Sequence, residues 1–191
     1  TNSLLMDQVD QLVEECKSGN RQAQMDIYRQ YYKPMYNTCL RMVSVSADAE
    51  DIMQNSFIDA FRSIKSYRGK SPFYYWLRRI VINNAMDHLK NRNPDMFLTD
   101  TLPEIPETGD DAEDGSVELQ VNAVKNAMDQ LHNDYRVILS LYLFEGMDQE
   151  EIGDILKLNP GNVRTRLSRA RQALISLLSD YSRRSPADRN F

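Results

Sequence analysis

The sequence contains very few of the residues on which disulfide frameworks and metal sites depend. Two cysteines, Cys16 and Cys39, and two histidines, His88 and His132, are spread over 191 residues. They are too few and too scattered for a disulfide network or a zinc site, so both thiols are expected to be buried as small apolar side chains. We therefore expect no bound metal and no cofactor.

Long apolar runs and recognisable catalytic motifs are missing as well. No stretch approaches the roughly 18 consecutive apolar residues of a membrane span. The chain also does not begin with a basic segment followed by an apolar one, so we expect neither membrane insertion nor export but a cytoplasmic location. There is no glycine-rich phosphate loop, no histidine pair at metal-ligand spacing and no cysteine or serine with a recognisable base. An enzymatic function is not expected.

The formal net charge of −5 conceals a strong local segregation of charge. Residues 62–92 carry eight basic side chains and one acidic one, and residues 157–184 carry seven and one. Between these two blocks, residues 95–118 carry nine acidic side chains and no basic one. Because a phosphate backbone responds to local charge, each basic block is a candidate nucleic-acid surface.

Apolar residues recur at three- and four-residue spacings along almost the whole chain, which predicts an all-α protein. In the first half, helices are expected over residues 4–13, 25–43, 46–64 and 73–90. Helical spacing returns at Val117, and Asn133 is expected to cap a further helix whose apolar run ends at Gly146.

The segment 93–116 interrupts this pattern with prolines, glycines and most of the acidic run. Such a composition cannot build a core and predicts an extended or disordered linker. We therefore expect two small helical domains, residues 1–92 and 117–182, joined by this acidic linker and followed by a C-terminal tail, 183–191. Each domain carries one basic block.

Residues 148–178 predict two helices separated by a tight turn. Asp148, with Glu151 three residues later, has the pattern of a capping box, and Asn159 followed by Pro160 marks the start of the second helix. One face of that helix is apolar and expected to be buried: Val163, Leu167, Ala170, Leu174 and Leu177. The other faces offer Arg, Asn, Thr and Ser near the helix N-terminus, which suits a major-groove reader. An ordinary packed helix pair with a solvated arginine face is the alternative.

The first basic block interleaves aromatic side chains with basic ones. A loop, Tyr67 to Pro72, precedes a helix that begins with the four aromatic residues 73–76. Proteins hold unstacked bases in this way, because each base stacks on a ring and each phosphate needs a cation. Four consecutive aromatic residues cannot share one helix face. The buried side is expected to comprise Phe73, Trp76, Leu77, Ile80 and Val81, and the exposed side Tyr74, Tyr75, Arg78, Arg79 and Asn83.

Three motifs in series resemble the extracytoplasmic-function (ECF) type of bacterial RNA polymerase sigma factor, in the sigma-70 family. The segment 48–54, DAEDIMQ, resembles the acidic motif of the second conserved region. Phe73-x-x-Trp76-Leu77-x-Arg79-Ile80, with Asn83 and Asp87, resembles the promoter-melting helix. The segments 150–152 and 161–171 resemble the closing helix-turn-helix. The resemblance covers residues 20 to 178 in the family's order.

The resemblance implies a role for each motif. The helix from Asp48 would dock on core RNA polymerase through Asp48, Glu50, Asp51, Gln54, Asn55 and Asp59. The −10 element would be read and melted by Tyr67, Arg68, Gly69, Lys70, Ser71, Tyr74, Tyr75, Trp76, Arg78, Arg79 and Asn83. The −35 element would be read by Gly161, Asn162, Arg164, Thr165, Arg166, Ser168, Arg169 and Arg171. The acidic linker would thread the polymerase towards its active-site cleft and RNA exit channel.

Some positions depart from the family pattern. Asn55 stands where an acidic residue is usual, Ile82 where a basic one is common, and Asn91 interrupts the basic cluster that closes the melting helix. These departures bear on fine contacts, above all on the sequence preference at the −10 element.

The partners implied are core RNA polymerase, promoter DNA and a cognate anti-sigma factor. Two other functions are compatible with parts of the sequence. A stand-alone helix-turn-helix regulator would bind its operator tightly without polymerase. A helical adaptor that binds only protein would show little salt-dependent affinity for DNA. The basic aromatic block of the first domain argues against the stand-alone regulator, since a sensor domain has no need of it.

Overall fold

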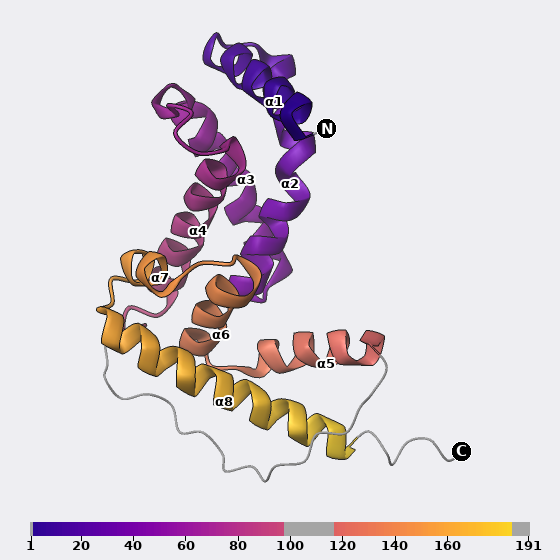
Figure 1. The fold of residues 1–191 in the computed structure, drawn as a ribbon, viewed down its shortest axis with the longest axis vertical. Helices are drawn as coiled ribbons and strands as arrows, with labels where there is room; N and C mark the ends of the chain where they lie inside the picture. The colour runs from indigo at the N-terminus through magenta and orange to yellow at the C-terminus, as the bar shows by residue number, and fades with distance from the viewer. Residues whose placement is uncertain (1, 98–116, 185–191) are drawn as a thin grey trace. The chain divides into compact units, whose positions relative to one another are not determined.

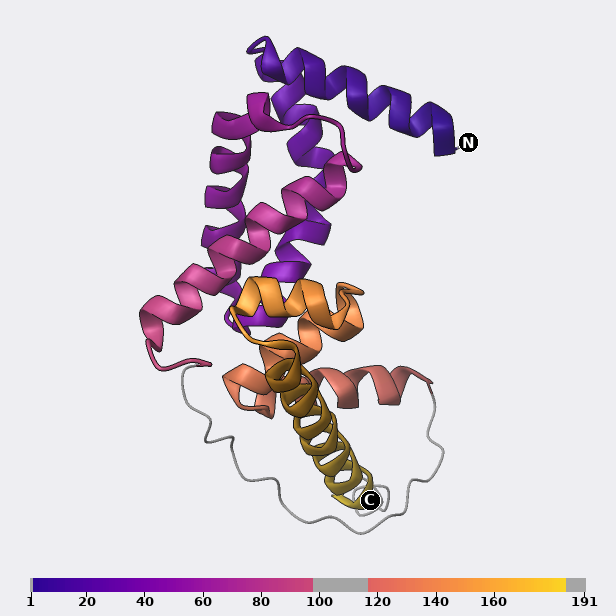
Figure 2. The same cartoon turned by 60° about the vertical axis from the view of Figure 1, so that its left-hand side comes forward.

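The computed structural model describes the backbone of residues 2–97 and 117–184 and the side chains of residues 8–97 and 121–180. Within these ranges every regular element is a helix, as Figures 1 and 2 show, which confirms the predicted all-α fold. No helix in the described ranges has the length and apolar character needed to cross a membrane. Residues 98–116, most of the predicted linker, and 185–191 of the predicted tail lie outside the described residues.

The chain divides into two compact units, Thr1–Pro94 and Asp95–Phe191. The first unit consists of α1 (Asn2–Lys17), α2 (Arg21–Val43), α3 (Ser46–Ser63), the short 3-10 helix η1 (Ile64–Ser66) and α4 (Phe73–Arg92). In this unit α2, α3 and α4 pack against one another, and α1 packs against α2 and η1. The loop Tyr67 to Pro72 therefore lies between an element that contacts α1 and the start of α4.

The core of the first unit forms where the apolar faces of α2, α3 and α4 meet. Asn20 caps α2, because its side-chain oxygen accepts two N–H groups of the first turn. The rings of Tyr28 and Phe57 join α2 to α3 edge to face, with centroids 4.9 Å apart. The buried side chains of this core include Ile27, Met35, Cys39, Met42, Phe57, Phe73, Leu77, Val81 and Ile82.

Both cysteines are buried in the first unit, as predicted, and neither forms a disulfide. Burial, with a smaller contribution from the charge of Glu15, raises the pKa of the Cys16 thiol to about 11. Cys16 is therefore protonated at neutral pH and is a poor nucleophile. Across the described part of the chain, no three His, Cys, Asp or Glu side chains gather into a group that could hold a metal ion.

The second unit contains α5 (Val117–Gln130), α6 (Asn133–Leu139), the π-helical segment η2 (Ser140–Phe144), α7 (Gln149–Leu156) and α8 (Pro160–Arg184). The long helix α8 packs against α5, α6 and α7. The core of this unit includes Tyr135, Val137, Ile138, Leu139, Leu141, Ile152, Val163, Leu167 and Ala170. Thus α8 is held by three helices along one side, and its opposite side is available for contacts with other molecules.

Two predicted boundaries in the second unit were wrong. The cap of α6 is His132, whose ring nitrogen accepts the N–H of Asp134, whereas Asn133 lies inside the helix and accepts from Arg136. The linker was predicted to begin at residue 93, but Met96 and Phe97 are buried and belong to the second unit. Met96 and Phe97 can be buried although acidic residues surround them in the sequence. Their burial depends on the apolar surface of the second unit that they pack against, and not on their neighbours in the chain.

Candidate nucleic-acid interface

The turn between α7 and α8 is built as its sequence predicts. The Asp148 side chain accepts two N–H groups of α7, and Glu151 accepts the N–H of Asp148, which completes the capping box. Asn159 accepts the N–H of Asn162 at 2.8 Å and caps α8, which begins at Pro160. Sequence reasoning missed Gly153: a Cβ added there would lie 2.9 Å from the Leu158 carbonyl oxygen, so the tight turn needs glycine.

The predicted two faces of α8 are present in the structure. Val163, Leu167, Ala170 and Leu174 are buried, and Leu177 is half-buried. The candidate DNA-reading side chains Arg164, Thr165, Ser168, Arg169 and Arg171 are exposed together with Gly161, and Asn162 is half-buried. Five exposed side chains that can form hydrogen bonds therefore lie between residues 164 and 171 of a well-capped helix.

Arg166 is the exception on α8, and its assignment to the DNA-reading set is corrected. It is only 3% exposed, and its Nη1 lies 3.2 Å from Asp134 Oδ2 on α6. Its guanidinium also covers the Phe97 ring, with the two groups 5.6 Å apart. Arg166 flanks the buried stripe, three residues after Val163, so it points into the unit and holds α8 to α6.

Arg171, in contrast, is exposed and positioned by an aromatic ring. Its guanidinium lies 4.7 Å from the centroid of the Tyr142 ring on η2. Stacking on a ring limits the conformations of a long side chain, so less entropy is lost when Arg171 binds a base or phosphate. The sequence carries no local signal for Tyr142, because the two residues are far apart along the chain.

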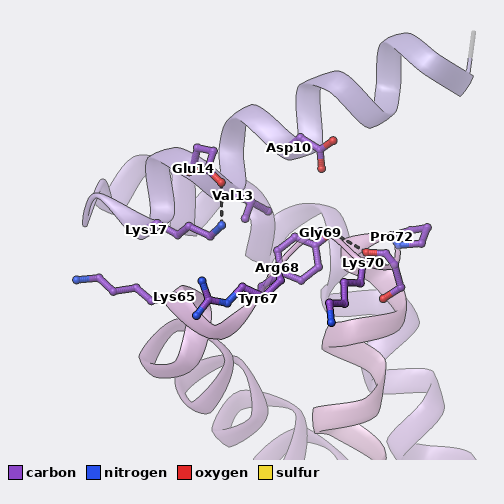
Figure 3. A pocket seen from close by; sticks show the side chains of 11 residues that line it. Asp10, Val13, Glu14, Lys17, Lys65, Tyr67, Arg68, Gly69, Lys70 and Pro72 are labelled. Atoms are coloured by element: carbon purple, nitrogen blue, oxygen red, sulfur yellow. Dashed lines mark hydrogen bonds and ion pairs between the residues drawn. The ribbon is translucent and has the colours of Figure 1, made fainter.

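In the first unit, a pocket of about 550 Å³ lies between α1 and the loop that precedes α4 (Figure 3). Its walls are Asp10, Val13, Glu14, Lys17, Lys65, Tyr67, Arg68, Gly69, Lys70, Ser71 and Pro72. The predicted loop residues Arg68, Gly69, Lys70 and Ser71 are thus brought together on one wall. The volume lies within the range of small-ligand pockets and accommodates a nucleobase. The contribution of α1 was not anticipated from the sequence.

Tyr67, which was predicted to take part in reading the −10 element, lines the pocket and is a largely buried support of this loop. It is 6% exposed, and its hydroxyl donates to the Ser71 carbonyl oxygen at 2.7 Å. Its ring packs against Phe73 and Trp76, with centroids 5.5 Å away in each case. Burial, together with the charge of Asp10, raises the pKa of the Tyr67 phenol, which keeps it a hydrogen-bond donor. Tyr67 therefore fixes the loop from inside.

The outer side of α4 carries three of the predicted side chains in one row. Tyr75, Arg79 and Asn83 are exposed at four-residue spacing, and so lie on one helix face. Tyr74 and Arg78 are half-buried. The Arg78 guanidinium lies 4.9 Å from the centroid of Tyr75 and 5.6 Å from that of Tyr74. The row combines a ring, a cation and an amide next to the loop of the pocket.

The inner side of α4 differs from its prediction in detail. Phe73, Leu77 and Val81 are buried as expected, but Trp76 and Ile80 are only half-buried. Ile82, where the sigma-factor pattern favours a basic residue, is fully buried in the core. A charged side chain at position 82 would lose its hydration in this core at a high cost in free energy. This cost explains why the chain has an isoleucine where the family usually has a basic residue.

The predicted polymerase contacts on α3 fall into two groups. Glu50, Asp51, Gln54, Asn55 and Asp59 are exposed. Asp48 is half-buried and forms an ion pair with Arg92 at the end of α4, with the His88 ring nitrogen 3.4 Å away. Its carboxylate thus joins α3 to α4, and its contact with polymerase stays a prediction. Asp59 accepts a hydrogen bond from Asn84 of α4 but keeps an exposed side.

Two family models match the chain, one in each unit. The description Sigma-70 region 2 matches residues 27–94, and Sigma-70, region 4 matches residues 122–174. The first range holds the loop and α4, and the second holds the helix-turn-helix, so each candidate surface lies in a separately matched region.

Relatives align with the chain over almost its whole length. The RNA polymerase sigma-H factor of Pseudomonas aeruginosa is 34% identical, with 94% of this chain and 98% of the relative covered. The ECF RNA polymerase sigma factor SigW of Bacillus subtilis is 33% identical, covering 88% and 95%. The ECF RNA polymerase sigma-E factor of Escherichia coli is 30% identical, covering 94% and 98%.

Solved structures show the same fold. CnrH, in complex with the cytosolic domain of CnrY, aligns with a TM-score of 0.55 at 22% identity, over 88% of this chain and 96% of that one. The sigma factor RpoE of Bartonella quintana, in complex with the anti-sigma factor NepR, aligns with a TM-score of 0.56 at 24% identity, over 81% and 96%. With both regions matched and relatives above 30% identity along its length, the chain belongs to the sigma-70 family of RNA polymerase sigma factors, in its extracytoplasmic-function group.

Proposed function

We propose that this sigma factor reads its promoter with two surfaces, each contained in one unit. The second unit inserts α8 into the major groove of the −35 element. The first unit captures an unstacked base of the −10 element and helps to open the duplex. The observation that best supports this division is the structure of α8, whose apolar stripe is buried and whose base-reading side chains are exposed.

At the −35 element, the N-terminal half of α8 provides the contacts. Arg164, Ser168 and Arg171 follow one another at spacings of four and three residues and therefore share one side of the helix. Gly161 has no side chain, so a phosphate can approach the N-terminus of the helix closely. The proposed set is Gly161, Asn162, Arg164, Thr165, Ser168, Arg169 and Arg171, without Arg166.

Replacing Arg164 with alanine should weaken −35 recognition by about 1–3 kcal/mol and relax the preference at one base pair, because an arginine fork on guanine is lost. The measurement is transcription with core polymerase from templates that vary each −35 position. Lys125→Ala, which removes an exposed cation from α5, is the control and should change nothing. An equal loss on every template would identify Arg164 as a phosphate contact and contradict its assignment to a base.

At the −10 element, the pocket and the outer side of α4 act together. Lys17, Lys65, Arg68 and Lys70 surround the pocket and can neutralise the phosphates on either side of a captured base. The row from Tyr75 to Asn83 then meets the separated strand, with Tyr74, Arg78 and half-buried Trp76 behind it. Gly69 has a φ of +69°, so the loop turns sharply and exposes its basic side chains at the rim.

Core polymerase is the proposed partner of the exposed side of α3. Glu50, Asp51, Gln54 and Asn55 are exposed, and Asp59 follows about one turn after Asn55. The acidic linker would occupy the path of nucleic acid in the polymerase, as the family resemblance implies. A cognate anti-sigma factor that covers the two DNA-reading surfaces would hold the protein inactive. The factor acts without catalysis of its own, alongside polymerase in the cytoplasm.

Run-off transcription with core polymerase on a pool of genomic fragments tests the proposed function. Promoter-selective transcripts should appear only when this protein is added, and their templates should share −35 and −10 sequences. The free protein should bind the same fragments weakly. Tight, symmetric binding without polymerase would instead support a stand-alone regulator, and no salt-dependent DNA affinity even with polymerase would support a protein adaptor.

A further inference from the structure

One wall of the pocket in the first unit comes from α1, outside the residues that the region 2 family model matches. Figure 3 places Asp10, Glu14 and Lys17 on α1, and Arg68 and Lys70 on the loop. The matched residues begin at 27, ten residues after α1 ends at Lys17. The α1 wall therefore lies outside the matched region 2 residues.

The two carboxylates on this wall have different surroundings. Glu14 forms an ion pair with Lys17 at 2.8 Å, so its charge is already compensated. Asp10 is exposed and has no hydrogen-bond or ion-pair partner among the described side chains. Asp10 lies close enough to the loop for its charge to affect Tyr67. The pKa of the Tyr67 phenol is raised mainly by burial and, to a smaller extent, by the charge of Asp10. Asp10 is thus an available acceptor at the pocket.

A carboxylate in a base pocket distinguishes bases by their hydrogen-bond donors. Adenine and cytosine present an exocyclic amine, and guanine presents an amine beside a ring N–H. Thymine presents two carbonyl oxygens, which a carboxylate repels, with a single N–H between them. The basic side chains at the rim compensate the phosphates, so Asp10 can face the base itself.

We propose that Asp10 is a specificity-determining residue of the −10 pocket, which accepts a hydrogen bond from an amine-bearing base and rejects thymine. This inference rests on the proposed capture of a base by the first unit. It assigns part of the −10 preference to α1, in addition to the loop and α4.

The test is transcription by core polymerase with this sigma factor from a template pool randomised across the −10 element. With the wild-type protein, thymine should be depleted about tenfold at one position, the factor expected when a hydrogen bond to a charged group is lost. Asp10→Asn should remove that depletion, since its amide can donate to a carbonyl as well as accept. Asp10→Ala should also remove it. Asp26→Asn, the same charge change on α2 away from the pocket, should preserve it.

The outcomes separate this inference from the proposed function. Promoter-selective transcription with thymine depletion unchanged in both Asp10 variants would overturn the role of Asp10 and leave the sigma-factor function intact. If the wild-type protein gave promoter-selective transcription with no position at which thymine is depleted, the role of Asp10 would also be overturned and the sigma-factor function would stay intact. No promoter-selective transcript with the wild-type protein would overturn the proposed function and the inference with it. Because Asp10 is exposed, both variants should keep the wild-type helical circular dichroism, which is measured alongside.

Discussion

Replacing Leu167 with aspartate should unfold the second unit and leave the first unit folded. Leu167 is 2% exposed in the middle of the buried face of α8. A carboxylate there loses its hydration without gaining a partner, a cost of several kcal/mol in real proteins. Since a small domain is stable by only about 5–15 kcal/mol in total, this one change removes most or all of that stability.

Hydrogen exchange of the full chain, followed peptide by peptide, measures this effect. Amides of α6, α7 and α8 should exchange rapidly in Leu167→Asp, whereas those of α2, α3 and α4 should keep their protection. Ser168→Asp is the matched control, because the neighbouring residue is exposed. It should remain folded but bind −35 DNA less well, as a carboxylate repels phosphate. Retained protection of α8 in Leu167→Asp would contradict the assignment of its buried face.

Replacing Arg166 with methionine should destabilise the second unit by about 3–5 kcal/mol, the usual cost of removing one partner of a buried ion pair. Methionine fills much of the same volume but leaves the Asp134 carboxylate buried without its cation. That carboxylate also accepts the N–H of Phe97 at 3.2 Å, so the loss reaches three segments of the unit. Urea unfolding of the full chain should show an earlier transition for the second unit.

Arg169→Met is the contrasting variant, since Arg169 is an exposed arginine on the same helix. Its stability should change by less than about 0.5 kcal/mol, while −35 binding weakens. Adding Asp134→Asn to Arg166→Met should recover part of the lost stability, because the unpaired charge is then removed. Equal urea midpoints for Arg166→Met and the wild-type protein would show that the ion pair does not stabilise the unit.

The features that could be predicted from the sequence depend on neighbours along the chain. The capping box of Asp148 and Glu151 and the cap at Asn159 involve residues within three positions, and a helix stripe repeats every three or four. The helical fold, the turn before α8 and its two faces were therefore confirmed. The boundaries at residues 93 and 133 were not, because the choice of cap and the burial of a short apolar pair depend on the packed unit.

The roles that the sequence did not reveal depend on partners far away in the sequence. Arg166 looks like its arginine neighbours until Asp134, 32 residues earlier, is placed against it. Asp48 resembles the other acids of α3, but Arg92 lies 44 residues later. The contribution of Asp10 to the pocket arises only because α1 packs against η1. Tertiary contacts determine whether a charged side chain forms an ion pair inside the unit or belongs to a binding surface. The spacing of residues along the sequence does not show which of the two applies.

The burial of Phe97 makes the segment just before residue 98 part of the folded second unit. Phe97 has a left-handed φ of +63°, a conformation that costs of order 1–3 kcal/mol and is held by Asp134 and Arg166. The strained backbone at residue 97 therefore persists only while both partners are in place. Two side chains from α6 and α8 thus decide how far the folded part of the second unit extends towards its N-terminal end.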